Sequence, residues 1–371
     1  MTEKTRPSML PDRASALPEP ESTATVEFGY RSIVSRRGPL ALRWSMRTLL
    51  ICAALGVLTL LITVVALTLG DYPLTVGQVW AALFGDAGSG FARTVVVGWR
   101  LPRALAAVMF GAGLGAAGAV FQSLTRNPLA SPDIIGFSAG SYTGALIVII
   151  LVQGSYLQLA GGALIGGVAT AALVYVVAWR RGVQGFRLII VGIAVSAMLT
   201  SFNTWLMLTA DLEVAMSAAA WGAGSLNGTS WDQTLYGSAS ILVLLAVLAV
   251  LAPGLRQLEL GDDSAKATGV RTEPTRLAVM VTGVALTATV TAAAGPIVFI
   301  ALAAPQIARR LTRSPGVTIA AAAFTGAFLL AAADVVAQHA LPIALPVGVV
   351  TVVVGGAYLV WLIIHEVRRR A

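Results

Sequence analysis

The sequence predicts an all-α polytopic membrane protein that crosses the bilayer about ten times. Of its 371 residues, 57% are hydrophobic and 11% are charged, whereas about a quarter of the residues in a soluble domain are charged. Apolar runs of roughly 20 residues, the length that crosses a bilayer, recur from residue 44 onward, and the charged residues gather between them. These observations predict a polar tail, residues 1–43, followed by a membrane domain, residues 44–371.

The tail is rich in Pro, Ser, Glu and Arg. Because it has no apolar core to fold around, we expect it to be disordered. The charged start is not followed by the short apolar segment of a signal peptide, so the first apolar run is interpreted as a membrane span.

Apolar run length and loop composition give the expected spans. A small surface helix is expected between the fifth and sixth spans, in Asp211–Trp231. The ten spans are Trp44–Gly70, Leu101–Leu124, a third from Pro132 onward, Leu157–Trp179, Leu188–Ala210, Thr234–Ala252, Thr275–Ala294, Pro296–Leu311, Val317–Gln338 and Val347–Ile364. An even number of spans places both termini on one side of the membrane.

The second and third spans are rich in glycine. In lipid, helices associate through close backbone approach, which small residues on one face permit. We therefore expect both spans to be buried among other helices rather than lipid-facing. The glycines are Gly111, Gly115 and Gly118 in the second span and Gly136, Gly140 and Gly144 in the third.

The distribution of basic residues predicts the orientation. With a cytoplasmic N terminus, 22 of the 25 Lys and Arg residues lie on the cytoplasmic side, as the positive-inside rule requires. The three exceptions are Arg93, Arg100 and Arg103. The rule also accounts for the net charge of +8 better than a nucleic-acid partner does, since a basic soluble reading surface is missing.

Several kinds of chemistry find no support in the sequence. The single cysteine, Cys52, rules out disulfides and thiolate metal sites and is interpreted as a packing residue, and no cofactor is expected. Gly136-Phe137-Ser138-Ala139-Gly140 fits the G-x-S-x-G pattern of serine hydrolases, which needs a strand-to-helix turn and a histidine partner. Here it falls in a membrane span, and both histidines, His339 and His365, lie at span edges, so helix packing is the favoured interpretation.

The two usual energy sources of a transporter are also missing. Ion coupling usually needs an ionisable residue at mid-membrane depth, but Asp133 and Asp334 fall at span ends, where helix capping or surface contact explains them. A P-loop needs Gly-Lys-Ser/Thr, whereas Lys4 and Lys266 follow Glu3 and Ala265. A transporter of this kind needs a separate ATPase partner.

Two further patterns concern such a role. The cytoplasmic loop from Arg256 to Thr272 begins with Gly-Asp and predicts a short helix, Asp263–Thr268, that stops at Gly269. It fits either a groove of a soluble partner or an ordinary surface connector. In the fifth span, Ser196, Thr200 and Asn203 form one polar stripe. Such a stripe either stabilises the contact with a neighbouring helix or lines a channel.

Four stretches resemble the FecCD family of ABC-transporter permeases, which import iron-siderophore complexes, haem and vitamin B12. The resemblance runs from about residue 44 to the end. The stretches are RLPRALAAVMFGAGLGAAGAVFQSLTRNPLASPDIIGFSAG, LELGDDSAKATGV, GPIVFIALAAPQIARRL and LPVGVVTVVVGGAYLVWLI. FQSLTRNPLASPDIIGF together with AAAWGAGSLNG is most similar to the ferric-enterobactin type.

The resemblance implies a ten-span, type II importer permease that has no catalytic activity of its own. A second permease chain would pair with it, with a heterodimer favoured, while two cytoplasmic ATPases bind below and a substrate-binding protein docks above. Arg100 and Arg103 would meet carboxylates of the binding protein, and Gln338 stands where the family often has a third arginine. The ATPase-coupling residues would be Gly261, Asp262, Asp263, Ala265 and Gly269.

The resemblance also places the fifth span beside the pore, which favours pore lining for Ser196, Thr200 and Asn203. The expected cargo is a ferric-siderophore complex, of the catecholate type in the ferric-enterobactin reading, crossing the inner membrane of a bacterium. Haem or cobalamin transport within the same family is the alternative. An ion-coupled transporter and an intramembrane serine protease are rival classes that lack the required residues.

Overall fold

The computed structural model describes residues 32–37, 40–85, 90–179, 185–316 and 318–370. They fall into two compact units, Met1–Arg47 and Thr48–Ala371.

The first unit contains two short strands where the sequence predicts a disordered tail. Strands β1 (Ser32–Arg37) and β2 (Leu40–Ser45) pair antiparallel, with Ser32 opposite Ser45. Ile33 and Val34 are strand-favouring residues. The strand pairing gives backbone N–H and C=O groups partners within the chain, whereas in a disordered tail water would supply them. This differs from the expected tail, of which residues 1–31 and 38–39 lie outside the described residues.

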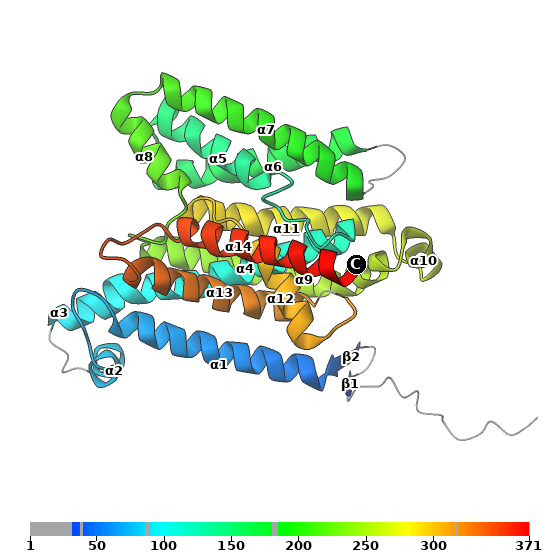
Figure 1. Cartoon of the computed structure of the whole chain (residues 1–371), viewed down its shortest axis with the longest axis horizontal. Helices are drawn as coiled ribbons and strands as arrows, with labels where there is room; N and C mark the ends of the chain where they lie inside the picture. Colours follow the sequence, from blue (N-terminus) through cyan, green and yellow to red (C-terminus); the bar gives the residue numbers. More distant parts are fainter. Residues whose placement is uncertain (1–31, 38–39, 86–89, 180–184, 317, 371) are drawn as a thin grey trace, which may run out of the picture. The chain divides into compact units, whose positions relative to one another are not determined.

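The described part of the second unit is helical, as predicted (Figure 1). The elements are α1 (Met46–Thr68, which begins two residues before this unit), α2 (Val76–Phe84), α3 (Gly90–Arg93), the π-helical η1 (Thr94–Arg100), α4 (Leu101–Thr125), α5 (Phe137–Ile147), the π-helical η2 (Val148–Val152), α6 (Tyr156–Ala178), α7 (Gly185–Thr209), α8 (Leu212–Gly222), α9 (Trp231–Glu259), α10 (Asp262–Ala267), α11 (Thr272–Ala294), α12 (Ile300–Thr312), α13 (Ile319–His339) and α14 (Val347–Arg370).

Each of the ten predicted spans corresponds to a helical stretch. Among the described residues, 7 stretches are long and apolar enough to cross a membrane, and Phe137–Val152 and Val347–Val360 are shorter apolar helices. The eighth span is the 13-residue α12. The surface helix expected in Asp211–Trp231 is α8.

Helix α4 lies at the centre of the second unit. It packs against α9, α11, α12 and α13, and 78% of the apolar window in Gly90–Thr125 is buried, against 11% for α1. Phe110 and Phe121 on α4 are fully buried core residues. The prediction that the second span is surrounded by other helices is therefore confirmed.

The glycines of these spans mark close helix crossings. A Cβ added at Gly111 would meet the carbonyl oxygen of Gly326 on α13, and one at Gly144 would meet that of Gly162 on α6. No larger residue fits either position without separating the helices. The small-residue prediction holds for both α4–α13 and α5–α6.

Two connections interrupt the helices inside the bundle. Residues 126–136 join α4 to α5, and residues 295–299 join α11 to α12. Ala130 and Ile135 in the first connection are fully buried. Each connection ends on a left-handed residue, Gly136 with φ 91° and Phe299 with φ 69°. Helices α5 and α12 therefore begin within the protein.

Candidate functional site

Candidate site residues occur at both ends of the helical bundle. In Figure 1 α2, α3 and α8 lie at one end and α10 lies at the other. We call these the α3 end and the α10 end.

Arg100, at the α3 end, is committed to contacts within the chain. Its Nη1 donates to the Leu67 carbonyl at 2.9 Å and its Nη2 to the Tyr72 carbonyl at 2.7 Å. Leu67 belongs to the last turn of α1, where a positive charge is favoured by the helix dipole. Gly70 lets the guanidinium approach, because a Cβ there would lie 2.6 Å from Nη2. Arg100 thus holds the α1–α2 connection.

Arg103 forms a two-pronged ion pair with Asp334 of α13. Arg103 Nε lies 2.9 Å from Oδ2, and Arg103 Nη2 lies 2.7 Å from Oδ1. The side chains are 18% and 6% exposed, and such fork geometry gives the strongest hydrogen bonds of this kind. The interpretation of Asp334 as a cap or surface contact is therefore wrong, because its carboxylate is buried by this pairing.

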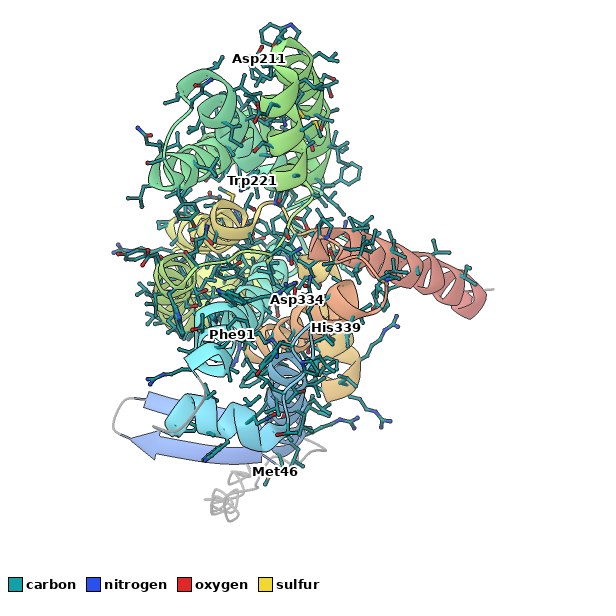
Figure 2. All side chains as sticks on the ribbon, turned by 90° about the vertical axis from the view of Figure 1, so that its left-hand side faces the viewer. Met46, Phe91, Asp211, Trp221, Asp334 and His339 are labelled. Carbon is teal, nitrogen blue, oxygen red and sulfur yellow. The ribbon has the colours of Figure 1, made fainter. Side chains whose placement is uncertain are left out.

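A cavity of about 450 Å³ brings the three predicted docking residues together. We call it the arginine cavity. Its lining includes Arg100, Arg103, Gln338, Asp71, Asp334 and His339. Figure 2 looks onto the α3 end and labels Asp334 and His339 side by side. Gln338 Nε2 donates to Asn227 Oδ1 at 2.8 Å, which ties α13 to the loop before α9.

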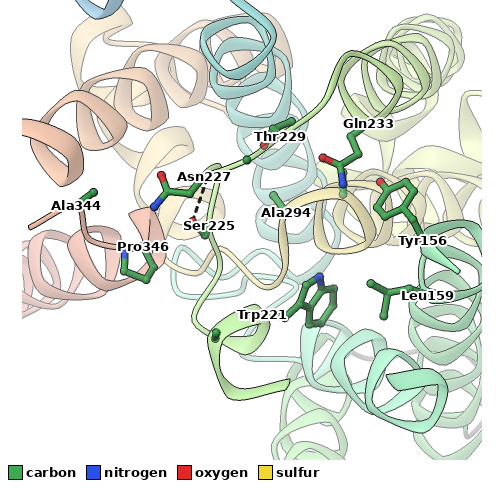
Figure 3. Close-up of a pocket in the computed structure, with 13 residues that line it drawn as sticks. Tyr156, Leu159, Trp221, Ser225, Asn227, Thr229, Gln233, Ala294, Ala344 and Pro346 are labelled. Atoms are coloured by element: carbon green, nitrogen blue, oxygen red, sulfur yellow. Dashed lines mark hydrogen bonds between the residues drawn. The ribbon is translucent and has the colours of Figure 1, made fainter. Parts of the chain in front are cut away.

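A second cavity of about 470 Å³ lies on the other side of that hydrogen bond. We call it the Trp221 cavity, and Figure 3 shows it with Tyr156, Trp221, Asn227 and Gln233 around it. Asn227 N–H donates to Ser225 Oγ at 3.0 Å, which shapes the loop. Its lining combines aromatic, aliphatic and uncharged polar residues. Sequence reasoning missed this cavity because its residues come from four separate stretches of the chain, within 156–159, 220–233, 293–294 and 344–346.

At the α10 end, Asp262 gathers two guanidinium groups. Arg276 Nη2 lies 2.7 Å from Oδ1 and 2.8 Å from Oδ2, and Arg126 Nη2 lies 3.5 Å from Oδ1. Arg276 also binds Glu273 at 2.8 Å, and Arg126 donates to the Leu258 carbonyl at 2.8 Å. These four charged residues, the coupling cluster, connect α10 to the ends of α4 and α11.

The remaining predicted coupling residues shape α10. Gly261 precedes it with φ 116° and Gly269 follows it with φ 85°, both conformations that favour glycine. Ala265 is fully buried, whereas Asp263 is exposed. The helix Asp262–Ala267 begins one residue earlier and ends one residue earlier than predicted.

The polar stripe of α7 is only partly buried. Thr200 is exposed and donates to the Ser196 carbonyl at 2.8 Å, while Asn203 is 5% exposed with its Oδ1 atom unpaired among the described residues. Ser196 is half-buried against the connection before α5: a Cβ at Gly136 would lie 3.0 Å from the Ser196 Cβ.

Ser138 has a partner that the sequence did not indicate. Its Oγ donates to Asp133 Oδ1 at 2.6 Å, and Ser138 lies in the first turn of an α-helix that follows an irregular connection rather than a strand. The hydrolase interpretation of G-x-S-x-G is not supported by this setting. The carboxyl five residues before the serine was the one available signal.

Comparisons with known proteins agree with this architecture. Residues 58–365 match the FecCD transport family. The chain is 48% identical over 327 residues to the ferric enterobactin transport system permease protein FepG of Escherichia coli, covering 88% of this chain and 99% of that protein. It is 34% identical over 327 residues to the iron(3+)-hydroxamate import system permease protein FhuG of Bacillus subtilis, covering 85% and 97%.

A solved structure shares the fold. It is described as an inward-facing conformation of a metal-chelate type ABC transporter, and it aligns with a TM-score of 0.74 at 28% identity over 85% of this chain and 99% of that chain. Family match, relatives and fold agree over the same region, and this chain is a multi-pass membrane protein that belongs to the FecCD transport family.

Proposed function

We propose that this chain is the permease subunit of an ATP-driven importer that carries ferric-siderophore complexes, of the catecholate type, into the bacterial cytoplasm. The observation that carries the proposal is the 48% identity to the ferric enterobactin transport system permease protein over 99% of its length. The Trp221 cavity is lined by aromatic, aliphatic and uncharged polar residues, which suits a large chelate that must pass without being held tightly.

The transport experiment uses proteoliposomes containing the chain, a partner permease and an ATPase pair, supplied with a binding protein and radioactive ferric catecholate. We expect uptake that requires ATP and persists when ionophores collapse ion gradients. Haem and cobalamin serve as competitors. Uptake without ATP would contradict the proposal and favour a secondary transporter. Preferred uptake of haem or cobalamin would contradict the assignment of a ferric siderophore as the substrate.

The α10 end is proposed to face the cytoplasm and seat an ATPase subunit, with both termini on that side. The basic residues of the α10 end support this orientation, and a short rigid helix held by the coupling cluster can transmit motion. A reporter that fluoresces only in the cytoplasm, fused after Ala371, is expected to be fluorescent. An inactive C-terminal reporter would reverse the orientation.

The α3 end is proposed to receive the substrate-binding protein at the rim of the arginine cavity. Charge reversal of Arg100 and Arg103 together is expected to weaken docking in a pull-down while leaving the ATPase complex intact. Because Arg103 pairs with Asp334, the matched control adds Asp334→Arg, which restores an opposite charge within the chain. Unchanged affinity for the binding protein would contradict this assignment.

The stripe Ser196, Thr200 and Asn203 is proposed to line the pathway beside a second permease, with a heterodimer favoured. The exposure of Thr200 on a membrane helix supports a wet or partner-covered face. A cysteine at Thr200 in a Cys52→Ser background is expected to react with a water-soluble maleimide in the assembled complex. A cysteine there that reacts only with lipid-soluble reagents would place the stripe against lipid.

A further inference from the structure

Helix α2 packs against the rest of the second unit through one of its faces. Val79 and Ala82 are buried in a small apolar core that also contains Leu67 of α1. A capping box fixes the start of the helix: Thr75 N–H donates to Gln78 Oε1 at 2.8 Å, and Gln78 N–H donates to Thr75 Oγ1 at 3.3 Å. The position of α2 is therefore set by contacts within the chain.

The opposite face of α2 is apolar and exposed. Val76, Trp80 and Phe84 are spaced four residues apart, so they share one side of the helix. We call these three side chains the α2 face. Trp80 is 66% exposed and Phe84 is 71% exposed, and their ring centroids lie 4.5 Å apart. Single exposed apolar residues are ordinary on a protein surface, whereas contiguous ones mark a contact with something other than water.

The α2 face continues a surface that contacts lipid. Helix α1 is an apolar span with only 11% of its window buried, and Leu60, Leu61 and Val65 are exposed on it, as on a helix surrounded by acyl chains. Its 23 residues extend about 35 Å at 1.5 Å per residue, slightly more than the bilayer core of roughly 30 Å. The end of α1 at Thr68, and α2 soon after it, therefore lie at the level of the headgroups.

Helix α2 also runs in the direction expected of a helix on a membrane surface. Figure 1 shows α1 along the page and α2 almost end-on beside the end of α1, so α2 runs crosswise to the span. A crosswise helix at the end of a span lies in the plane of the membrane interface. Arg100 maintains this turn, because its guanidinium donates to the carbonyl oxygens of Leu67 and Tyr72.

The residue types and the place of the α2 face favour lipid over a protein partner. The second permease is proposed to pack beside α7, and Figures 1 and 2 both show α1 and α2 on the opposite side of the bundle from α7. The binding protein is proposed to dock at the arginine cavity, whose lining includes none of the three side chains of the α2 face. No charged residue occurs in Val76–Phe84, and tryptophan is enriched where acyl chains meet headgroups.

We propose that α2 is an interfacial anchor whose exposed face, Val76, Trp80 and Phe84, inserts among the lipids at the membrane surface. The anchor holds the connection that Arg100 organises at a fixed depth. This proposal requires only that the chain is a multi-pass membrane protein, so it does not depend on the cargo, the energy source or the orientation proposed above.

Site-specific fluorescence quenching on the full-length chain in nanodiscs tests the location of the α2 face. The dye NBD is attached to Val76→Cys, to Leu60→Cys in the middle of α1, or to Asp211→Cys at the exposed start of α8, each in the Cys52→Ser background. We expect lipids with a nitroxide near the headgroup to quench the Val76 dye about threefold more than lipids with a nitroxide near the chain end. The Leu60 dye should show the reverse order, and the Asp211 dye should be quenched only by iodide in the water.

Three results would overturn the proposal. A Val76 dye that iodide quenches as strongly as the Asp211 dye, with no quenching by either lipid, would place the α2 face in water. A dye that neither lipid nor iodide quenches would place it against protein. A dye with the same depth profile as Leu60 would place it in the bilayer core rather than at the interface.

Hydrogen–deuterium exchange in nanodiscs tests whether the α2 face anchors the helix. In the double variant Trp80→Gln and Phe84→Gln, which keeps good helix formers, we expect the amides of α2 to exchange about tenfold faster while those of α11 are unchanged. The matched control is Phe186→Gln, an exposed aromatic residue at the start of α7, which should leave α2 unchanged. Because Trp80 and Phe84 are exposed within the chain, lost protection reports lost contact with lipid.

A conservative variant separates the interfacial role from the bulk of the side chain. Trp80→Tyr keeps an amphipathic ring of the kind found at membrane interfaces, so it should retain most of the protection of α2. Unchanged exchange in the double variant would overturn the anchor, and so would a loss in Trp80→Tyr as large as that in the double variant.

Discussion

The two ends of the bundle use arginine and aspartate in different ways. At the α3 end, Arg103 and Asp334 form an exclusive, largely buried pair, with side chains 18% and 6% exposed. At the α10 end, Asp262 is shared between Arg276 and Arg126, and the carboxylate is 41% exposed. An exclusive buried pair has one stable arrangement, whereas a shared carboxylate near solvent can change partners at low free-energy cost.

This difference suggests a division of labour between the ends. The α3 end fixes α4 to α13 and the α1–α2 connection to Arg100, so it presents a preformed surface. The α10 end holds its short helix through charges that a docking partner can reach. The predictions below test this contrast, from the largest expected effect to the smallest.

Breaking the Arg103–Asp334 pair should have the largest effect on stability. In Asp334→Ala the Arg103 charge loses its partner in a mostly buried site, so we expect a loss of about 3 kcal/mol in the free energy of unfolding. Thermal unfolding in detergent measures it, with Arg93→Ala, an exposed arginine, as the control. Joint replacement by Arg103→Met and Asp334→Leu should recover most of the loss. A fully stable Asp334→Ala protein would remove the contrast between the ends.

Removing Asp262 should have a smaller effect on the fold and a clear effect at the partner. Arg276 is only 9% exposed and would keep Glu273 as a partner, so we expect a loss of about 1 to 2 kcal/mol in stability. Because α10 would lose its tie to α11, the affinity for the ATPase should fall about tenfold, measured by titration with the purified subunit. Asp263→Ala, an exposed neighbour, should leave stability unchanged. Equal losses of stability in both variants would contradict the role of the cluster.

The sequence predicted the helices far better than it predicted these charges. Span number follows from apolar run length, and the burial of α4 among other helices follows from its glycines, because both signals are local. Arg103 and Asp334 are 231 residues apart, and nothing in one sequence pairs them.

Replacing Arg100 should act locally. Arg100→Ala removes two hydrogen bonds to carbonyl oxygens. We therefore expect the free energy of local opening to fall by about 1 kcal/mol, only in the α1–α2 connection, as measured by hydrogen exchange at residues 67–74. Arg100→Lys can satisfy one of the two carbonyls and should recover part of the protection. Loss of protection across α4 as well would mean that Arg100, like Arg103, fixes the bundle.

Replacing Arg126 should have the smallest effect. Its nitrogen lies 3.5 Å from Asp262, and the two side chains are 51% and 41% exposed, so the pair should contribute about 0.5 kcal/mol or less, and less still at high salt. Titrating the ATPase against Arg126→Ala at low and high salt should show a small loss that vanishes as salt rises. A loss as large as that of Asp262→Ala would mean that Arg126, not Arg276, positions α10. The α10 end would then depend on one fixed pair, as the α3 end does, and the exchange of partners proposed for Asp262 would not occur.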